Sequence, residues 1–383
     1  MVSHTEFFGN VMMNPIAWLR GEKMFSTSEL ERLSRYRYES SEVTALERFM
    51  YRYVWRKLGD RLPLWLAPNV ITISGMLVML LCACLGLWHS PSLHEICPPW
   101  VYLVMSMGVL FFQTSDVLDG QQARRTGSSS ALGQLFDHGC DALTTGAVLL
   151  STLVCLRTGT SFLTFVLLMG SQLAFFLAQL EEHWTGVLTT STAGLGVTEL
   201  QFLAALIPML TFFVTPAIWD RVVPGCVFLN YRHVIVICML LINLLTVIGS
   251  LWRIVKANRG FPLPALIQVR PFVMLMIAAS TLVGTHGALW ASAVSIPAIY
   301  MSLAMIVANV SGKRFPNFFP VQWPLLLLAS SRYLGLQDGA CVDCWLRYVL
   351  YVECVALSFF VIRVVLAIRK HLGIRVFHIK KNL

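Results

Sequence analysis

Residues 98–119 read PPWVYLVMSMGVLFFQTSDVLD, and residues 132–156 read LGQLFDHGCDALTTGAVLLSTLVCL. Each stretch is long and apolar enough to cross a bilayer, because the hydrocarbon core of ~30 Å takes about 20 helical residues. Aspartates stand at the end of the first stretch and near the start of the second. The sequence therefore predicts two membrane-spanning helices, joined by a short polar connection, with acidic groups on both sides of it.

The rest of the chain has the same apolar character. Of its 383 residues, 56% are hydrophobic and 13% are charged, and the mean hydropathy is +0.68. A soluble domain carries about 25% charged residues, so the composition excludes an ordinary soluble enzyme, a disordered protein and a small disulfide scaffold. The net charge of +9 sits largely in the polar ends and short loops. We therefore expect contact with anionic lipid headgroups and no nucleic-acid partner.

Repeated apolar stretches predict an all-α polytopic membrane protein with about ten transmembrane helices. The two stretches that flank Gly284–Gly287 are the least clearly separated. An even number of spans places both termini on one side, where most basic loop residues gather, so the positive-inside bias predicts that both termini are cytosolic. The predicted spans are residues 69–90, 98–119, 132–156, 161–182, 197–218, 229–253, 269–286, 288–310, 318–337 and 345–368.

Residues 28–62 precede the first span and mix basic residues with regularly placed leucine and aromatic side chains, such as Leu33, Tyr36 and Trp55. This pattern is typical of an amphipathic helix that lies in the membrane interface, with arginine stems covering its apolar rim. A solvated connector is the alternative interpretation of the same residues.

Four aspartates surround the connection between the second and third predicted spans. Asp116 and Asp119 are spaced i,i+3, and Asp137 and Asp141 are spaced i,i+4, so each pair shares one helix face. A charge at the centre of a membrane helix costs ~2.5–3.5 kcal/mol on insertion scales, so these acids need a partner. Oxygen ligands suit hard ions such as Mg²⁺ or Mn²⁺ rather than zinc. Two ions ~3.5–4 Å apart would clamp a group that undergoes in-line displacement at phosphorus.

The residues between the two acid pairs suit a substrate that contains phosphate. Gly120 allows a ligand to approach the backbone, and Ala123 keeps the same helix face shallow. Arg124 offers a guanidinium that can bind phosphate oxygens, and Gly133 is expected to let the two helices pack closely. The alternative is a helix cap in which Arg124 and Arg125 neutralise the acids. Two bases against four acids would leave an excess of negative charge, which disfavours that alternative.

The four aspartates, with Gly120, Ala123, Arg124 and Gly133, resemble the signature of the CDP-alcohol phosphotransferase family. The flanking sequence is similar to the eukaryotic choline/ethanolamine phosphotransferase branch of that family. The resemblance covers roughly residues 28 to 383, and the first 25 or so look like an extension. The similar segments are Pro68–Thr72 (PNVIT), Ala123–Thr126 (ARRT), Phe136–Asp141 (FDHGCD), His183–Trp184 (HW), Val197–Glu199 (VTE) and Val376–Lys380 (VFHIK).

The resemblance implies transfer of phosphocholine or phosphoethanolamine from CDP-choline or CDP-ethanolamine to diacylglycerol, with release of CMP. The aspartates 116, 119, 137 and 141 would hold two Mg²⁺ or Mn²⁺ ions against the diphosphate. Arg124 would bind phosphate. Asn69, which offers both a donor and an acceptor, would line the nucleotide site with Gly120, Ala123 and Gly133.

The same resemblance implies a homodimer in the endoplasmic reticulum or Golgi membrane, with the active site facing the cytosol. It divides the chain into a cytosolic N-terminal segment with the interfacial helix (1–62), a catalytic core (63–220), and C-terminal spans with a basic cytosolic tail (221–383). Besides its substrates, membrane lipids are the expected partners.

The acceptor hydroxyl needs a base. In the wider family the last aspartate, here Asp141, is the usual candidate, but a metal-bound carboxylate is a weak base because the cation stabilises its charged form. His138 is spaced i,i+3 from Asp141, and imidazole exchanges protons near neutral pH, so we favour His138. A hydrogen bond that only holds Asp141 is its alternative role. Glu199 could assist proton transfer, or only stabilise the start of the fifth span.

Two other functions stay open at this stage. The same chemistry would serve an enzyme that uses CDP-diacylglycerol with a soluble alcohol such as inositol. A membrane transporter or lipid scramblase is the alternative from another class, because acids inside the membrane also occur in ion pathways. Transporters commonly carry internal repeats, and this chain shows no convincing repeat.

Overall fold

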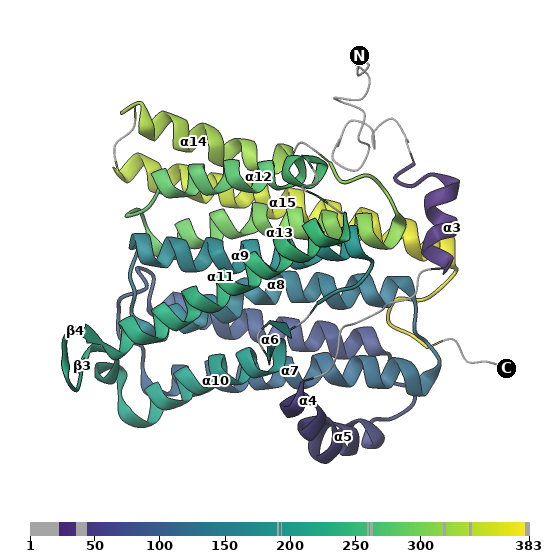
Figure 1. Cartoon of the computed structure of the whole chain (residues 1–383), viewed down its shortest axis with the longest axis horizontal. Coiled ribbons are helices and arrows are strands. Elements are labelled where there is room, and N and C mark those ends of the chain that lie inside the picture. Colours follow the sequence, from purple (N-terminus) through teal and green to yellow (C-terminus); the bar gives the residue numbers. More distant parts are fainter. Residues whose placement is uncertain are drawn as a thin grey trace.

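The computed structural model describes residues 23–379 with the exception of 36–43, 190, 193, 259, 261–262, 317–318 and 337–338. In this part of the chain, nine helices are long and apolar enough to cross a membrane. Figure 1 shows these helices lying along one common direction in a single bundle. The protein is therefore an all-α integral membrane protein with multiple spans, which confirms the predicted fold class.

The nine long helices are α6 (Pro68–His89), α7 (Pro99–Thr126), α8 (Ala131–Leu156), α9 (Phe162–Thr185), α10 (Val197–Val214), α11 (Tyr231–Ala257), α12 (Leu263–Thr281), α13 (Gly287–Ser311) and α15 (Gly339–Leu372). Two small antiparallel hairpins lie in the connections on either side of α10. The first pairs β1 (Ser191–Thr192) with β2 (Leu195–Gly196), and the second pairs β3 (Val222–Val223) with β4 (Cys226–Asn230). A short 3₁₀ turn, Pro216–Asp220, follows α10.

The stretch 318–337, predicted as a full span, contains only a 3₁₀ turn at Pro320–Gln322 and the helix α14 (Trp323–Tyr333). The 11 residues of α14 reach only ~16 Å at 1.5 Å per residue. Prolines at 316, 320 and 324 explain the shortening, because proline lacks the N–H that a helix interior needs. Average hydropathy does not register the missing N–H groups, so the prediction from sequence overestimated the length of this helix.

The region predicted as one interfacial helix forms several short helices. Tyr36 and the residues before 23 lie outside the described part of the chain, as do residues 380–383 of the basic tail. Phe49 and Tyr53 are half-exposed, and partly exposed aromatic rings of this kind suit a membrane interface; the interfacial location itself stays a prediction. The short helices are α3 (Thr27–Arg35), α4 (Ala45–Met50), a π-helical turn at Tyr51–Trp55 and α5 (Arg56–Arg61).

Helices α6 and α7 pack closely through small residues. A methyl group built at Gly75 would lie 2.7 Å from Cβ of Ser115, and one at Gly108 would lie 2.6 Å from Sγ of Cys82. No real side chain tolerates such distances, so glycine at these positions sets the separation of the two helices. This packing brings the start of α6 alongside the end of α7.

The connection between α7 and α8 is short. Helix α7 ends at Gly127, which adopts the left-handed conformation (φ 62°), and Ser130 caps α8 by accepting a hydrogen bond from the Gly133 amide at 3.1 Å. Serine at an N-cap and glycine after a helix end are both favourable. The C-terminal end of α7 and the N-terminal end of α8 are therefore neighbours.

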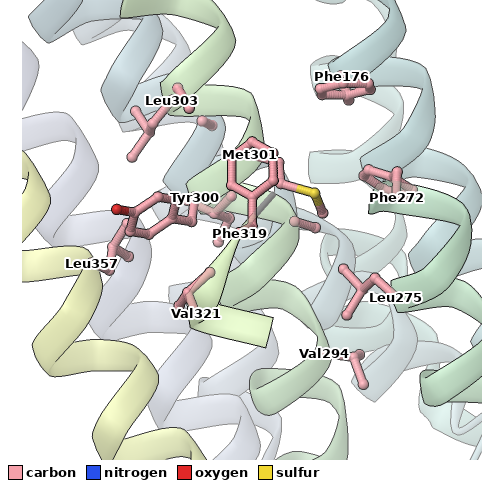
Figure 2. Packing of buried hydrophobic residues seen from close by; sticks show 14 of the residues in the cluster. Phe176, Phe272, Leu275, Val294, Tyr300, Met301, Leu303, Phe319, Val321 and Leu357 are labelled. Atoms are coloured by element: carbon pink, nitrogen blue, oxygen red, sulfur yellow. The ribbon is translucent and has the colours of Figure 1, made fainter. Parts of the chain in front are cut away.

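Helix α13 lies at the centre of the C-terminal half. It is the most buried of the long helices, because 89% of the residues in its most apolar 18-residue stretch are buried inside the molecule. Figure 2 shows its side chains packed against those of neighbouring elements. The ring of Tyr300 stacks on Phe360 of α15 at 4.6 Å, and Phe176 of α9 stacks on Phe272 of α12 at 5.5 Å. A helix that is apolar all round requires such burial.

Candidate active site

The aspartates of α7 and α8 meet at the neighbouring ends of these helices. One carboxylate oxygen each from Asp116, Asp137 and Asp141 lies within 4.8 Å of the others. Oδ1 of Asp137 is buried and has no hydrogen-bond partner among the described residues. Like charges at this separation repel, and a buried oxygen without a donor is costly. A divalent cation among these oxygens would remove both costs, so the donor set fits Mg²⁺ or Mn²⁺.

Asp119 lies next to this group but is not part of the three-oxygen cluster. It is 5% exposed, and its Oδ2 accepts a hydrogen bond from the hydroxyl of Thr72 on α6. Asp119 and Asp137 both line the cavity described next. The fourth acid is therefore positioned by α6 at the border between the carboxylate cluster and that cavity.

A cavity of about 420 Å³ opens beside the aspartates, within the size range of small-molecule sites. Its walls come from the start of α6, the end of α7, the α7–α8 connection and the first turns of α8. All five residues predicted to bind substrate line it. The lining residues are Pro68, Asn69, Thr72, Asp119, Gly120, Ala123, Arg124, Ser128, Ser129, Ser130, Gly133, Gln134 and Asp137.

The two neighbouring arginines have different roles. Arg124 is exposed and lines the cavity. Arg125 instead donates to backbone carbonyls of α5 and the residues around it, including Asp60 at 3.1 Å and Leu62 at 3.2 Å. Among the described residues, neither arginine forms an ion pair with an aspartate of the site. The alternative of a salt-bridged helix cap is therefore wrong.

The two glycines of the cavity leave its walls open. A methyl group at Gly120 would meet only the Arg124 guanidinium, at 3.5 Å. One at Gly133 would lie 3.5 Å from the Ser130 hydroxyl and 3.8 Å from Oδ1 of Asn69. These are ordinary contact distances, so helix packing does not require Gly133, contrary to expectation. A methyl group at either position would instead project among the groups that line the cavity.

The three candidate bases have different surroundings. His138 is 6% exposed, does not line the cavity, and its Nε2 lies 2.7 Å from the amide nitrogen of Gln134, which does. Asp141 belongs to the carboxylate cluster. Glu199 accepts a hydrogen bond from the Gly196 amide at 2.9 Å, the structural role that its position at a helix start predicts. Which of them takes the proton stays a prediction.

Sequence reasoning assigned no site role to several residues that the structure places here. Thr72 holds Asp119, and the serines 128–130 and Gln134 line the cavity. Thr72 stands in the PNVIT segment, so its signal was present in the resemblance. Gln134 is spaced i,i+4 from His138, and that pattern could have suggested their contact.

Glu47 of the short helix α4 also lies near this end of the bundle. Partial burial raises the pKa of the Glu47 carboxyl above its usual 4.5, and the negative charges of Glu199 and Asp116 raise this pKa further. Gln113 of α7 donates to the carbonyl of Thr198 at 3.0 Å, which brings the start of α10 beside α7 close to Asp116. The α4 segment and α10 therefore add two carboxylates behind the aspartate cluster.

Comparison with known proteins agrees with this geometry. Residues 65–225 match the family model described as CDP-alcohol phosphatidyltransferase. The matched segment, which is less than half of the chain, is similar to that family. The matched range contains every residue that we predicted for the site, from Asn69 to Glu199.

Curated proteins similar to this chain include cholinephosphotransferase 1 from Gallus gallus, 38% identical over 197 residues (51% of this chain and 58% of the relative). The Homo sapiens cholinephosphotransferase 1 is 34% identical over 210 residues (54% and 51%). An uncharacterised CDP-alcohol phosphatidyltransferase class-I family protein 1 from Dictyostelium discoideum is 28% identical over 252 residues (66% and 66%). The matches to the cholinephosphotransferases span little more than half the length of those relatives.

Proposed function

We propose that this protein transfers phosphocholine or phosphoethanolamine from CDP-choline or CDP-ethanolamine to diacylglycerol, producing phosphatidylcholine or phosphatidylethanolamine and CMP. One observation carries the proposal: three carboxylate oxygens lie within 4.8 Å of one another beside a cavity lined by Arg124 and Asn69. The names of the relatives favour choline as one head group, and nothing in the site favours choline over ethanolamine.

The reaction is a displacement at phosphorus. The acceptor hydroxyl oxygen forms a bond to the phosphorus that carries the head group, and the bond from this phosphorus to the bridging oxygen breaks. CMP leaves with the electron pair, and the hydroxyl proton passes to a base. When bound, two Mg²⁺ or Mn²⁺ ions neutralise the diphosphate and the charge that develops on CMP. Asp116, Asp119, Asp137 and Asp141 are the residues that would hold these ions.

The cavity residues would bind the nucleotide part. Arg124 would hold a phosphate oxygen through its guanidinium, and Gly120 and Gly133 would leave room for the ligand beside the backbone. We favour His138 as the base, with Asp141 as the alternative. His138→Asn would then lower kcat and leave unchanged both the KM for the CDP-alcohol and the Mg²⁺ concentration needed for half-maximal activity. Asp141→Asn would lower kcat and would also raise that Mg²⁺ concentration. Unchanged kcat in His138→Asn would remove His138 from the role.

Both termini and the active site are proposed to face the cytosol, although α14 is too short to span and nine long helices remain in the described part of the chain. The hydrogen bond from Asn69, at the start of α6, to Val376, after α15, supports a common side for both ends of the bundle. The support is that basic residues gather at the end of the bundle where the aspartates lie, including Arg124 and Arg125 on α7 and Arg369 and Lys370 on α15, as the positive-inside bias requires. Protease protection of tagged termini in sealed microsomes tests this orientation. The endoplasmic reticulum or Golgi location and the homodimer remain predictions, tested by fractionation and by light scattering of the purified protein.

The decisive experiment supplies microsomes that express this chain with labelled CDP-choline or CDP-ethanolamine and diacylglycerol, with Mg²⁺ or with a chelator. We expect labelled phospholipid with at least one donor and loss of the product on chelation. A parallel reaction with CDP-diacylglycerol and inositol tests the alternative donor. Product only in that reaction would replace the proposed substrates, and no product with any donor would favour a transporter or scramblase.

A further inference from the structure

The C-terminal segment returns to the nucleotide cavity. Helix α15 ends at Leu372, and Gly373, with φ of 62°, turns the chain out of the helix direction. Figure 1 shows the yellow segment after α15 running across the end of the bundle. We call Ile374–Phe377 the C-terminal strap. Ile374 and Val376 pack against the main hydrophobic core, so the strap is attached to the bundle.

The strap makes two contacts at the site. The side-chain amide nitrogen of Asn69 donates to the backbone carbonyl of Val376 at 2.9 Å. The ring of Phe377 packs edge-on against Phe136 at 5.9 Å, and Phe136 directly precedes Asp137. Asn69 lines the cavity, and Phe136 belongs to the helix that carries two of the aspartates. The first contact therefore joins the strap to a residue of the cavity, and the second joins it to the helix that carries Asp137 and Asp141.

We propose that the C-terminal strap is a positioning element of the nucleotide site, which fixes the side-chain amide of Asn69 so that its oxygen is presented to the cytidine. This inference rests on the proposed function, because it assumes a cytidine nucleotide in the cavity.

The orientation follows from hydrogen-bond chemistry. A backbone carbonyl only accepts, so it can bond only to the NH₂ of Asn69, and this fixes which end of the amide faces the strap. Oδ1 is then left for other partners, and it lies 3.8 Å from the position that a methyl group would occupy at Gly133, which also lines the cavity. Asn69 therefore offers an acceptor to the ligand. The ligand group that pairs with it is a donor, either the exocyclic amine of cytosine or a ribose hydroxyl.

Without the strap, Asn69 would be free to turn its NH₂ toward the ligand. An amide in the wrong orientation presents a donor to a donor, and the site would lose its preference for the matching nucleotide. The strap itself is held by limited contacts, because Phe377 is 44% exposed. Removing one aromatic ring should therefore loosen the strap without unfolding the bundle.

The first test is Phe377→Ala, compared with Phe377→Tyr, which keeps the ring, and with His378→Ala, which alters the exposed neighbour. Loss of an aromatic pair predicts a KM for the CDP-alcohol raised roughly three- to tenfold. We expect kcat and the KM for diacylglycerol to change less than about twofold, since neither depends on nucleotide binding. Phe377→Tyr and His378→Ala should resemble the wild type. A chain that ends at Gly373 should show a larger KM effect than one that ends at Ile379.

The second test measures nucleotide binding without turnover, by calorimetry with CMP, UMP and 2′-deoxy-CMP in the presence of Mg²⁺. Uracil carries an acceptor where cytosine carries its amine, so the wild type should prefer CMP over UMP if Asn69 reads the base. It should prefer CMP over deoxy-CMP if Asn69 reads the 2′-hydroxyl. In Phe377→Ala and in the chain that ends at Gly373, whichever preference exists should shrink.

The outcomes separate this inference from the proposed function. If the wild type shows no transferase activity, the proposed function fails, and CMP binding still tests the strap. The inference is overturned if both preferences survive in the altered chains, or if CMP, UMP and deoxy-CMP weaken in parallel, as a general loss of structure would produce. The inference is also overturned if, in Phe377→Ala or in the chain that ends at Gly373, kcat falls while the KM for the CDP-alcohol stays constant. Thermal melting of each variant in detergent checks that the bundle is intact.

Discussion

Two groups of acids inside this bundle differ in how their charge is balanced. Glu181 on α9 is 1% exposed, and its carboxylate accepts hydrogen bonds from Arg253 at 2.5 and 3.0 Å and from Thr189 at 2.5 Å. Its neighbour Glu182 accepts one from Asn309 at 3.2 Å. These acids have protein partners drawn from α11, α13 and the α9–α10 connection.

Among the described residues, the aspartate cluster of α7 and α8 has no arginine or lysine partner within ion-pair distance. Its arginine neighbour on α7, Arg125, binds backbone carbonyls instead, and Oδ1 of Asp137 is buried without a donor in the described part of the chain. Buried charges in proteins are paired or coordinate metals. The glutamate group satisfies the first condition, whereas the oxygens of the aspartate cluster fit the second, a divalent cation from outside the chain.

The largest expected effect is loss of catalysis in Asp137→Asn. This change removes one charge from the cluster at nearly constant volume, and a metal clamp contributes several kcal/mol of barrier lowering. Transferase activity per mole of protein should fall by roughly 10³-fold or more. Mg²⁺ should raise the melting temperature of the wild type and should have little effect on the variant.

Asp60→Asn is the matched control, since this carboxylate is 60% exposed and lies on α5. It should retain wild-type activity and wild-type stabilisation by Mg²⁺. Full activity in Asp137→Asn, measured on protein present at the normal level, would contradict the two-metal proposal.

For the glutamate group we expect a loss of stability rather than a loss of activity. Arg253→Met leaves the Glu181 carboxylate buried without its cation, which costs roughly 3 kcal/mol when one partner of a buried pair is removed. The melting temperature should therefore fall markedly, while the KM for the CDP-alcohol changes little. The double variant Glu181→Gln with Arg253→Met should recover much of the lost stability. If the double variant is as unstable as the single one, the pair is not the source of the stabilisation.

The adjacent arginines sharpen the comparison within one helix turn. Arg124→Ala should raise the KM for the CDP-alcohol roughly ten- to a hundredfold, because a hydrogen bond to a charged group contributes about 1.5–3 kcal/mol. Arg125→Ala removes donors to the carbonyls of Asp60 and Leu62, so it should lower the melting temperature with little change in KM. Steady-state kinetics and melting curves on both variants test these roles. A raised KM in Arg125→Ala together with a lowered melting temperature in Arg124→Ala would refute the assignment of Arg124 to substrate binding and Arg125 to stability.

The aspartate geometry was predictable because it depends on local rules. Spacings of i,i+3 and i,i+4 fix a helix face, and the short 127–130 connection leaves the two helix ends adjacent. The five residues predicted to bind substrate lie within a few turns of those aspartates or in a segment similar to the family, and all five line the cavity. This part of the site could therefore be predicted from residue spacing over short distances along the sequence.

Long-range contacts were not predictable in the same way. Asn69 and Val376 are 307 residues apart, and no periodicity along the chain links them. The pairing of Arg253 with Glu181 across 72 residues is of the same kind. The sequence shows which residues are unusual for a membrane helix, but only packing shows which of them find a partner.

The smallest expected effect concerns Glu95, an acid in the α6–α7 connection, which lies outside the spans. Burial opposes its ionisation, but hydrogen bonds from the Ser92 side chain and from backbone amides, including those of Ser92 (3.0 Å) and His94 (3.4 Å), outweigh this and lower the pKa of Glu95 to about 2, from a usual 4.5. Because this pKa is lowered on folding, the stabilisation is complete above pH 4.5 and is lost as the pH falls toward 2. Solvent screening at this exposed carboxylate keeps the contribution at about 1 kcal/mol or less.

Glu95→Gln should therefore lower the melting temperature slightly at pH 7, and the difference from the wild type should narrow as the pH falls below 4.5. Transferase activity at pH 7 should be unchanged, because Glu95 lies at the opposite end of α7 from Asp116. Melting curves of both proteins between pH 7 and pH 3 measure the difference. A gap that widens with acid would show that Glu95 is protonated more easily in the folded protein than in the unfolded chain. We therefore expect Glu95 to affect stability alone, and the aspartate cluster, near the far end of α7, to affect turnover.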